Sequence, residues 1–182
     1  MEATKKIFRP IAALAMTLGI AACASIPPTA VAISPFDKER YLGKWYEIAR
    51  KDVIFERDMD NTYAEYSLNE DGTIKVYNSG YNTGKKKWSG ITGKAKFIKD
   101  ENTAMLKVSF FGPFYSGYNV LAIDENYEYA LVAGKSHKYL WILSRRTSIP
   151  DDIKTRFLET AEKAGFDTSD LLWIGHDRNS HY

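Results

Sequence analysis

The sequence predicts an all-β domain, an eight-stranded antiparallel up-and-down barrel with one C-terminal α-helix packed outside it. Three observations predict this fold class. Aromatic residues (12 Tyr, 9 Phe and 4 Trp in 182 residues) favour β-structure. Eight short apolar runs follow one another at regular spacing, with turn residues between them. An open sheet of eight strands would leave two unpaired edges, and closure removes both while enclosing room for a small ligand.

The first 22 residues have the pattern of an export signal. A basic stretch at residues 5–9 precedes an apolar run at residues 11–20. This run is too short to cross a bilayer of roughly 30 Å as a permanent helix. Cys23, the only cysteine of the chain, follows directly after Ala21 and Ala22. We expect residues 1–22 to be a signal peptide; the alternative is an ordinary secretory signal beside an unrelated cysteine.

The residues around Cys23 resemble the lipobox of bacterial lipoproteins. The resemblance implies cleavage before Cys23, lipid attachment to its thiol and acylation of the new amine. Several acyl chains anchor firmly where one is marginal. Residue 24 is Ala and not Asp, so the resemblance implies the outer membrane, with the protein facing the periplasm. Residues 23–35 contain three prolines, and we expect them to form a lipidated N-terminus and a flexible tether. The folded domain is expected over residues 36–182.

Charge and cysteine content exclude several classes of protein. Without residues 1–22, the 25 basic and 23 acidic residues become 22 of each, and the chain is formally neutral. A neutral domain does not attract nucleic acid. A single cysteine permits neither an internal disulfide nor a cysteine cluster for zinc. We therefore expect no nucleic-acid partner, no metal and no cofactor.

The strands are expected where apolar and polar residues alternate with a period of two. Asn69 to Gly72, residues 81–87, residues 100–102 and residues 111–114 interrupt the alternation as turns or loops. The expected strands cover residues 45–50, 62–68, 74–79, a stretch around 94–97, 106–110, 118–124, 129–133 and 139–145.

A helix is expected from Asp151. Ser148 and two first-turn acids favour a helix start there, and Gly165 favours its end. Between them Ile153, Phe157, Leu158 and Ala161 recur at helical spacing. This apolar stripe should lie against the outside of the barrel.

Three short motifs resemble signatures of the lipocalin family. They are Gly43-Lys44-Trp45-Tyr46, Asp124-Glu125-Asn126-Tyr127 and Leu143-Ser144-Arg145, and they stand in the family's order. The whole chain resembles the bacterial outer-membrane lipoprotein subgroup. The resemblance implies that Trp45 closes one barrel end with Arg145 across its indole, and that Gly43 permits the close approach. Asp124 and Tyr127 belong to the same structural signature.

Candidate ligand contacts follow from the alternation of each strand. Phe55 and Met59 lie in the long first loop, a plausible lid, and Tyr115 is expected at the open end. The expected interior lining consists of Tyr66, Val76, Phe97, Leu106, Val108, Phe110, Val120 and Trp141. Apolar walls with a few phenol groups suit an acyl chain with a polar end. The alternative is that these side chains fill the barrel completely.

The function expected from the resemblance is that of a membrane-anchored carrier for hydrophobic ligands. Fatty acids or lysophospholipids are foremost, in storage, transport or repair of envelope lipids. We expect no enzyme, because no catalytic motif or inward pair of acids is present. An enzyme acting on a lipid and a structural lipoprotein with a filled barrel remain the alternatives. A homodimer through exposed aromatics such as Trp88 is also possible.

Overall fold

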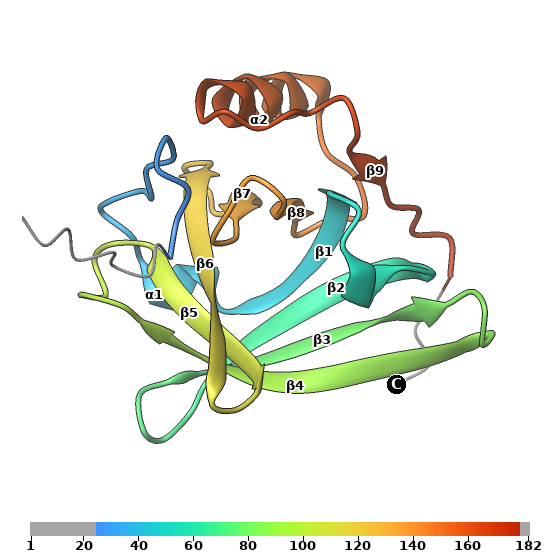
Figure 1. Ribbon diagram of the computed structural model, residues 1–182, viewed down its shortest axis with the longest axis horizontal. Coiled ribbons are helices and arrows are strands. Elements are labelled where there is room, and N and C mark those ends of the chain that lie inside the picture. Colours follow the sequence, from blue (N-terminus) through green and yellow to red (C-terminus); the bar gives the residue numbers. More distant parts are fainter. Residues whose placement is uncertain (1–24, 179–182) are drawn as a thin grey trace, which may run out of the picture.

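The computed structural model describes residues 25–178, so the expected signal peptide and Cys23 lie outside the described residues. Eight antiparallel strands form a closed ring, because β1 pairs with β2 on one side and with β8 on the other (Figure 1). The predicted barrel is therefore confirmed. The strands are β1 (Gly43–Arg50), β2 (Met59–Leu68), β3 (Ile74–Asn82), β4 (Lys87–Phe97), β5 (Met105–Phe111), β6 (Phe114–Ile123), β7 (Tyr129–Ala133) and β8 (Leu140–Ser144).

The β3–β4 hairpin is longer than the sequence pattern predicted. The expected loop at residues 81–87 shrinks to residues 83–86, because Tyr81 pairs with Trp88 and Asn82 with Lys87. The Tyr81 and Trp88 rings also meet edge to face, with centroids 6.0 Å apart. The residues of this extension are mostly polar and show no apolar alternation, so the sequence did not predict it. Strand pairing there depends on backbone hydrogen bonds and not on side-chain polarity.

The up-and-down order places alternate turns at opposite ends of the barrel. We call one end the floor; it carries Trp45 and the turns at residues 69–73, 98–104 and 124–128. We call the other end the mouth; it carries the loops at residues 51–58, 83–86, 112–113 and 134–139. The short helix α1 (Lys38–Tyr41) leads into β1 at the floor, and the 3-10 turn η1 (Ile54–Glu56) lies at the mouth.

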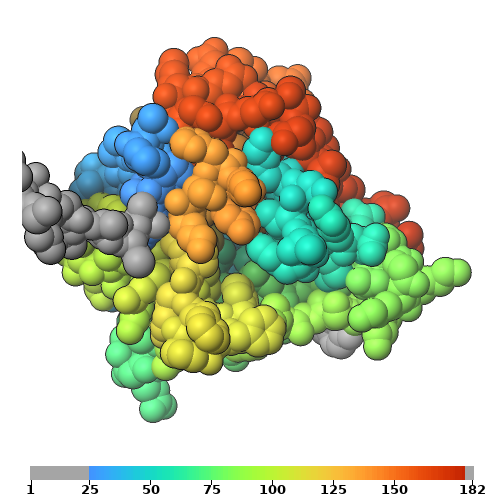
Figure 2. Space-filling view, in the orientation of Figure 1, coloured from blue at the N-terminus to red at the C-terminus, as the bar shows by residue number. Residues whose placement is uncertain are grey.

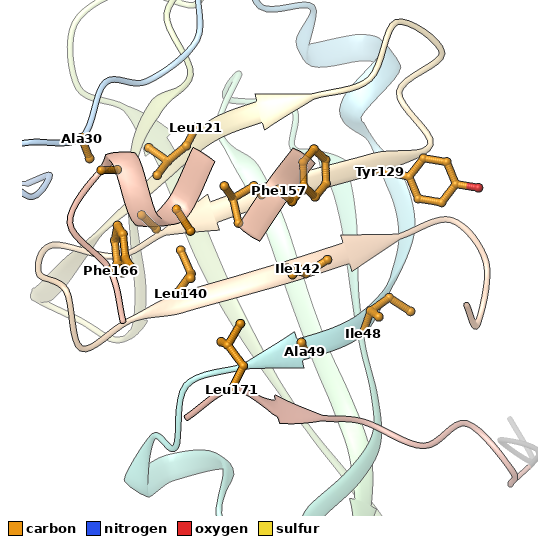
Figure 3. Packing of buried hydrophobic residues seen from close by; sticks show 14 residues of the cluster. Ala30, Ile48, Ala49, Leu121, Tyr129, Leu140, Ile142, Phe157, Phe166 and Leu171 are labelled. Carbon is orange, nitrogen blue, oxygen red and sulfur yellow. The ribbon is translucent and has the colours of Figure 1, made fainter. Parts of the chain in front are cut away.

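The C-terminal helix covers the outside of β6, β7 and β8, as predicted. Helix α2 (Asp151–Lys163) buries Phe157 and Ala161 completely against a cluster that includes Leu131, Leu140 and Ile142 (Figure 3). Its N-cap is Pro150, with no side-chain capping bond, and Gly165 follows its end with a positive φ of 85°. No helix among residues 25–178 is long and apolar enough to cross a membrane.

The C-terminal segment completes the wall between β1 and β2. These two strands pair only up to Tyr46 and Tyr63. Beyond that point the two-residue strand β9 (Leu172–Trp173) pairs with the end of β1, and Gly175 accepts a hydrogen bond from Asn61 N at 3.2 Å. The sequence did not predict this element, because two residues are too few to show a period.

Residues 25–35 are not the free tether that the sequence suggested. Pro27 and Ala30 are buried on the outside of the barrel, and Ile33 N donates to the Val120 carbonyl at 2.9 Å. Thr29 Oγ1 donates to the Ala164 carbonyl at 2.6 Å and lies 3.0 Å from His137 Nε2. The expectation was wrong for these residues because the barrel offers a complementary apolar surface that composition does not reveal. Residues 23 and 24 of the expected tether lie outside the described residues.

Candidate ligand-binding site

The floor is closed by Trp45 under an arginine. Trp45 is fully buried, and the Arg145 guanidinium carbon lies 3.8 Å from the centroid of its ring. Arg145 also donates hydrogen bonds to the carbonyls of Arg40, Leu42, Lys44 and Tyr127, at 2.8 to 3.2 Å. Gly43 has a φ of +92°, and a Cβ there would lie 3.3 Å from Arg145 Nη1. This end therefore offers no route for a ligand.

The β6–β7 turn is held by a carboxylate. Asp124 accepts hydrogen bonds from the backbone N–H groups of Asn126, Glu128 and Tyr129, at 2.6 to 2.9 Å. Tyr127 adopts a positive φ of 59°, and its hydroxyl accepts a hydrogen bond from Asp37 N at 2.9 Å. These contacts fasten the turn beside the floor, so Asp124 and Tyr127 stabilise the closed end, where the Tyr127 ring packs against the base of the interior cluster.

Three tyrosine hydroxyls meet just above the floor. Tyr118 lies 2.6 Å from Tyr41 and 2.8 Å from Tyr66, oxygen to oxygen. Burial is the main cause that raises the pKa of all three phenols above the ordinary value of 10, so they stay neutral. Two hydrogen bonds among three hydroxyls use two protons, which leaves one donor for an oxygen of another group.

The register identifies the side chains that face the interior. Residues directly opposite each other on neighbouring strands point to the same side of the sheet. Trp45 lies opposite Ala64, Ala64 opposite Asn78, and Asn78 opposite Ile91, so these four side chains share the inner face of β1 to β4.

The lower half of the interior is packed, whereas several inward-facing side chains of the upper half keep contact with solvent. Tyr66, Val76, Leu106 and Val120 are at most 7% exposed and belong to one apolar cluster with Trp45. By contrast, Ala64, Asn78, Val108, Phe110 and Trp141 are half-buried, and inward-facing Ile91 is 37% exposed. The exposure of inward-facing side chains therefore increases from the closed floor toward the mouth; Phe110 also borders the hollow on the outer face beside Lys94 and Tyr115.

The predicted lining residues fall into three groups. Those in the interior cluster are Tyr66, Val76, Phe97, Leu106, Val108, Phe110, Val120 and Trp141. Met59 lies at the mouth, where its methyl would be 3.1 Å from a Cβ on Gly80. Phe55 also lies at the mouth, but it is 63% exposed and does not cover the interior.

Tyr115 does not face the interior, contrary to expectation. Ser116 lies opposite inward-facing Val108, so its neighbour Tyr115 points outward. The Tyr115 ring lies under two lysine ammonium groups of the outer face, 5.1 Å from Lys96 and 5.4 Å from Lys107. The alternation of β6 alone gives this orientation, because inward-facing Val120, Tyr118 and Ser116 lie two residues apart.

A buried charge cluster occupies the mouth half of the interior. Arg50 Nη1 donates to Glu47 Oε1 at 2.8 Å, and Thr62 donates to the same oxygen at 3.0 Å. Arg50 Nε lies 3.5 Å from Glu56 Oε2, which accepts a hydrogen bond from Trp141 Nε1 at 3.2 Å. Two acids thus share one cation inside the barrel.

One of these two acids holds a proton. Burial, followed by repulsion from Glu47, raises the pKa of Glu56 to about 8. Burial also raises the pKa of Glu47, against the attraction of Arg50. Because Arg50 and Thr62 donate directly to Glu47, we assign the negative charge to Glu47 and the proton to Glu56.

Replacing Glu56 with glutamine should remove a pH dependence of stability. In the folded chain Glu56 keeps its proton up to about pH 8. In the unfolded chain its carboxyl has the ordinary pKa of 4.5 and loses the proton above that pH. The stability of the natural chain relative to Glu56→Gln is therefore greatest below pH 4.5 and declines as the pH rises to 8. We expect a relative loss of at least about 2 kcal/mol over this window in urea unfolding. Exposed Glu70→Gln is the control, and parallel pH curves for the natural chain and Glu56→Gln would contradict the assignment.

The sequence left several interior residues undetected. Arg50 and Glu56 were not candidates, since a β-bulge between Glu47 and Ala49 turns Arg50 inward. Asn78 was also missed; its side-chain oxygen is buried and has no hydrogen-bond partner among the described residues. An asparagine at an inward position of an apolar alternation was the available signal for it.

Other surface features do not form a competing site. Trp88, suggested for a dimer contact, packs on the outer face against Tyr63 and Tyr81. Two open hollows lie elsewhere, one beside Lys75, Thr92 and Lys94 of β3 and β4, the other at the floor near Phe36 and Glu125. Residues 25–178 contain no group of three His, Cys, Asp or Glu side chains that could hold a metal ion.

Known proteins resemble this chain along most of its length. Outer membrane lipoprotein Blc of Citrobacter freundii is 48% identical over 171 residues, covering 93% of this chain and 97% of that protein. Temperature-induced lipocalin-1 of Arabidopsis thaliana is 39% identical over 142 residues, covering 73% and 75%. The structure of insecticyanin from the tobacco hornworm Manduca sexta superimposes with a TM-score of 0.68 at 22% identity, covering 86% and 88%, which shows a shared fold.

The family profile described as a lipocalin-like domain matches residues 36–176. This range contains the floor, the ring of eight strands and the external helix. Together with the sequence identities, the match establishes that the chain belongs to the lipocalin family.

Proposed function

We propose that this lipocalin is a membrane-anchored carrier for hydrophobic molecules, with fatty acids or lysophospholipids foremost. The observation that carries the proposal is the solvent contact of inward-facing apolar side chains toward the mouth, above a closed floor. Ile91, Val108 and Phe110 are such side chains. Such a lining suits an acyl chain, because apolar surface of both the ligand and the protein is removed from water when the ligand enters.

Polar groups inside the barrel support recognition of one polar end. The Asn78 side-chain oxygen and the spare phenol proton of the tyrosine cluster offer an acceptor and a donor. The charged groups Glu47 and Arg50 bind each other, and Thr62 donates to Glu47 instead of standing free as a nucleophile. This pairing favours binding over chemical conversion of the ligand.

The proposed location is the periplasmic side of the bacterial outer membrane. The lipobox-like residues before Cys23 and the relatives named outer membrane lipoprotein support it. Residues 1–22 would be removed as the signal peptide, and acyl chains on Cys23 would hold the barrel at the membrane. Envelope lipids would then reach the carrier at a high effective concentration, as its use in storage, transport or repair requires.

Filling the upper interior should abolish ligand uptake. Ile91→Trp enlarges a side chain that points into the open half of the barrel. We expect at least about tenfold weaker binding of a palmitoyl lysophospholipid, because the loss of about two buried methylene contacts already has that effect. Native mass spectrometry of delipidated protein, titrated with the lysolipid, measures the affinity.

The matched control lies one residue further along the same strand. Thr92→Trp adds an indole to the outer face of β4 and should leave lysolipid binding unchanged. Equal affinities of the two variants would show that the ligand does not enter the barrel. Failure of the natural chain to take up any lysolipid or fatty acid would contradict the carrier function itself.

A further inference from the structure

The mouth of the barrel carries large apolar side chains that the fold itself leaves in water. Phe111 and Phe114 flank the β5–β6 turn and are 73% and 78% exposed, and Ile54 in η1 is 77% exposed. Together with Phe55, these residues place four exposed apolar side chains on two loops of the mouth. Figure 2 shows both loops, turquoise and yellow, on the face turned to the viewer. Exposed apolar side chains gathered at one end of a protein indicate a surface that binds another protein or a membrane.

The mouth loops carry more exposed basic side chains than exposed acidic ones. Their acids are Glu56, which is largely buried beside Arg50, exposed Asp58, and exposed Asp52, which pairs with Arg57 at 3.2 Å; Asp170 also lies at this end, paired with Lys51. The exposed lysines at the mouth are Lys85, Lys86, Lys87, Lys135 and Lys138. The floor turns carry Glu70, Asp71, Asp100, Glu101, Glu125 and Glu128, and three of these acids, Glu101, Asp71 and Glu128, pair with Lys38, Lys94 and Arg146. A basic rim around apolar side chains suits the surface of a bilayer that contains anionic phospholipids.

The described chain begins beside the middle of β6. Asn119 Nδ2 donates to the carbonyl oxygen of Ser25 at 2.8 Å, and a Cβ on Gly117 would lie 1.8 Å from that oxygen. Gly117 is three residues from Phe114 along β6. Cys23 precedes Ser25 by two residues, which span at most about 7 Å. Because residues 25–35 pack against the barrel, an anchor at Cys23 would hold the barrel close to the membrane.

We propose that the mouth is a membrane-docking surface, which seats the open end of the barrel on the lipid bilayer. The inference rests on the proposed acylation of Cys23, and it adds an orientation and a contact surface. Phe111, Phe114, Ile54 and Phe55 enter the interfacial region, while the lysines of the rim contact anionic headgroups. A ligand then passes between bilayer and barrel without crossing water.

The orientation is measured on the lipidated full chain in vesicles of phosphatidylethanolamine and phosphatidylglycerol. A fluorophore is attached to Gly112→Cys at the mouth or to Glu70→Cys at the floor. A Cβ at Gly112 meets no atom within 4 Å, and the acylated Cys23 thiol does not react with the label. Brominated acyl chains should quench the mouth label several-fold more strongly than the floor label. Equal quenching, or stronger quenching at the floor, overturns the docking surface.

The contribution of the apolar rim is measured without the anchor. Cys23→Ser protein should sediment with the same vesicles, and less so in high salt. Adding Phe111→Ser and Phe114→Ser should lower the bound fraction at least about tenfold, since two exposed phenyl groups no longer enter the interface. Leu68→Ser, an exposed apolar residue at the floor, is the control. Unchanged vesicle binding by the Phe111/Phe114 variant contradicts the proposal.

The two proposals fail in different ways. Loss of lysolipid uptake with preferential quenching at Gly112→Cys would contradict the carrier function and support the docking surface. Normal uptake with equal quenching of both labels would contradict the docking surface alone. Absence of an acyl group on Cys23 by mass spectrometry would remove the anchor, and the Cys23→Ser sedimentation would then decide whether the mouth binds lipid.

Discussion

Replacing Trp45 with alanine is expected to lower the free energy of unfolding by about 3 to 5 kcal/mol. The indole is fully buried, and the cavity left behind could not collapse, because the Tyr41 ring and Arg145 border it. Arg145 would also lose the aromatic face beneath its guanidinium group. Urea unfolding followed by far-UV circular dichroism measures the loss.

A matched control separates this effect from the general cost of removing a tryptophan. Trp173 in β9 is 46% exposed and contacts the Lys154 ammonium at 4.1 Å on the outer surface. Trp173→Ala should cost no more than about 1 kcal/mol, as a half-exposed side chain loses little burial. If the two variants unfolded at the same urea concentration, Trp45 could not be the residue that closes the floor.

Much of the fold could be predicted because its signals are local. Alternation identified the eight strands, and helical spacing placed Phe157 and Ala161 on the buried side of α2. The resemblance of three short motifs to a known family placed Trp45 and Arg145 together, although about one hundred residues separate them. These features were predictable because the periodicity of apolar residues and the short motifs are both visible in residues that are close in sequence.

Other features depend on the closed barrel and could not be predicted in the same way. A bulge reverses the parity of a strand, which brought Arg50 inward. The packing of Ala30 against the barrel needs a surface made by residues far along the chain. How far side chains fill the upper interior is a property of the whole ring, and no single strand pattern reveals it.

Replacing the buried Arg50 with methionine is expected to destabilise the protein strongly. The Arg50 side chain is only 4% exposed and lies between two acids, Glu47 and Glu56. Arg50→Met keeps much of its apolar volume but leaves a buried carboxylate without its counter-charge. Breaking such a pair by removing one partner typically costs about 3 to 5 kcal/mol. We expect this loss in urea unfolding at pH 7.

The buried carboxylate, and not the missing packing, should account for most of that loss. Adding Glu47→Gln to Arg50→Met removes the acid that received the 2.8 Å hydrogen bond, and the double variant should regain about half of the stability. Arg57→Met, which removes an exposed arginine paired with Asp52, should change stability by less than about 1 kcal/mol. A double variant no more stable than Arg50→Met would mean that Arg50 acts through its contacts with the carbonyls of Glu56 and Met59, at 2.7 and 3.1 Å. In that case its role would be to fasten the first mouth loop over the barrel, and the shared charge of the two acids would be incidental.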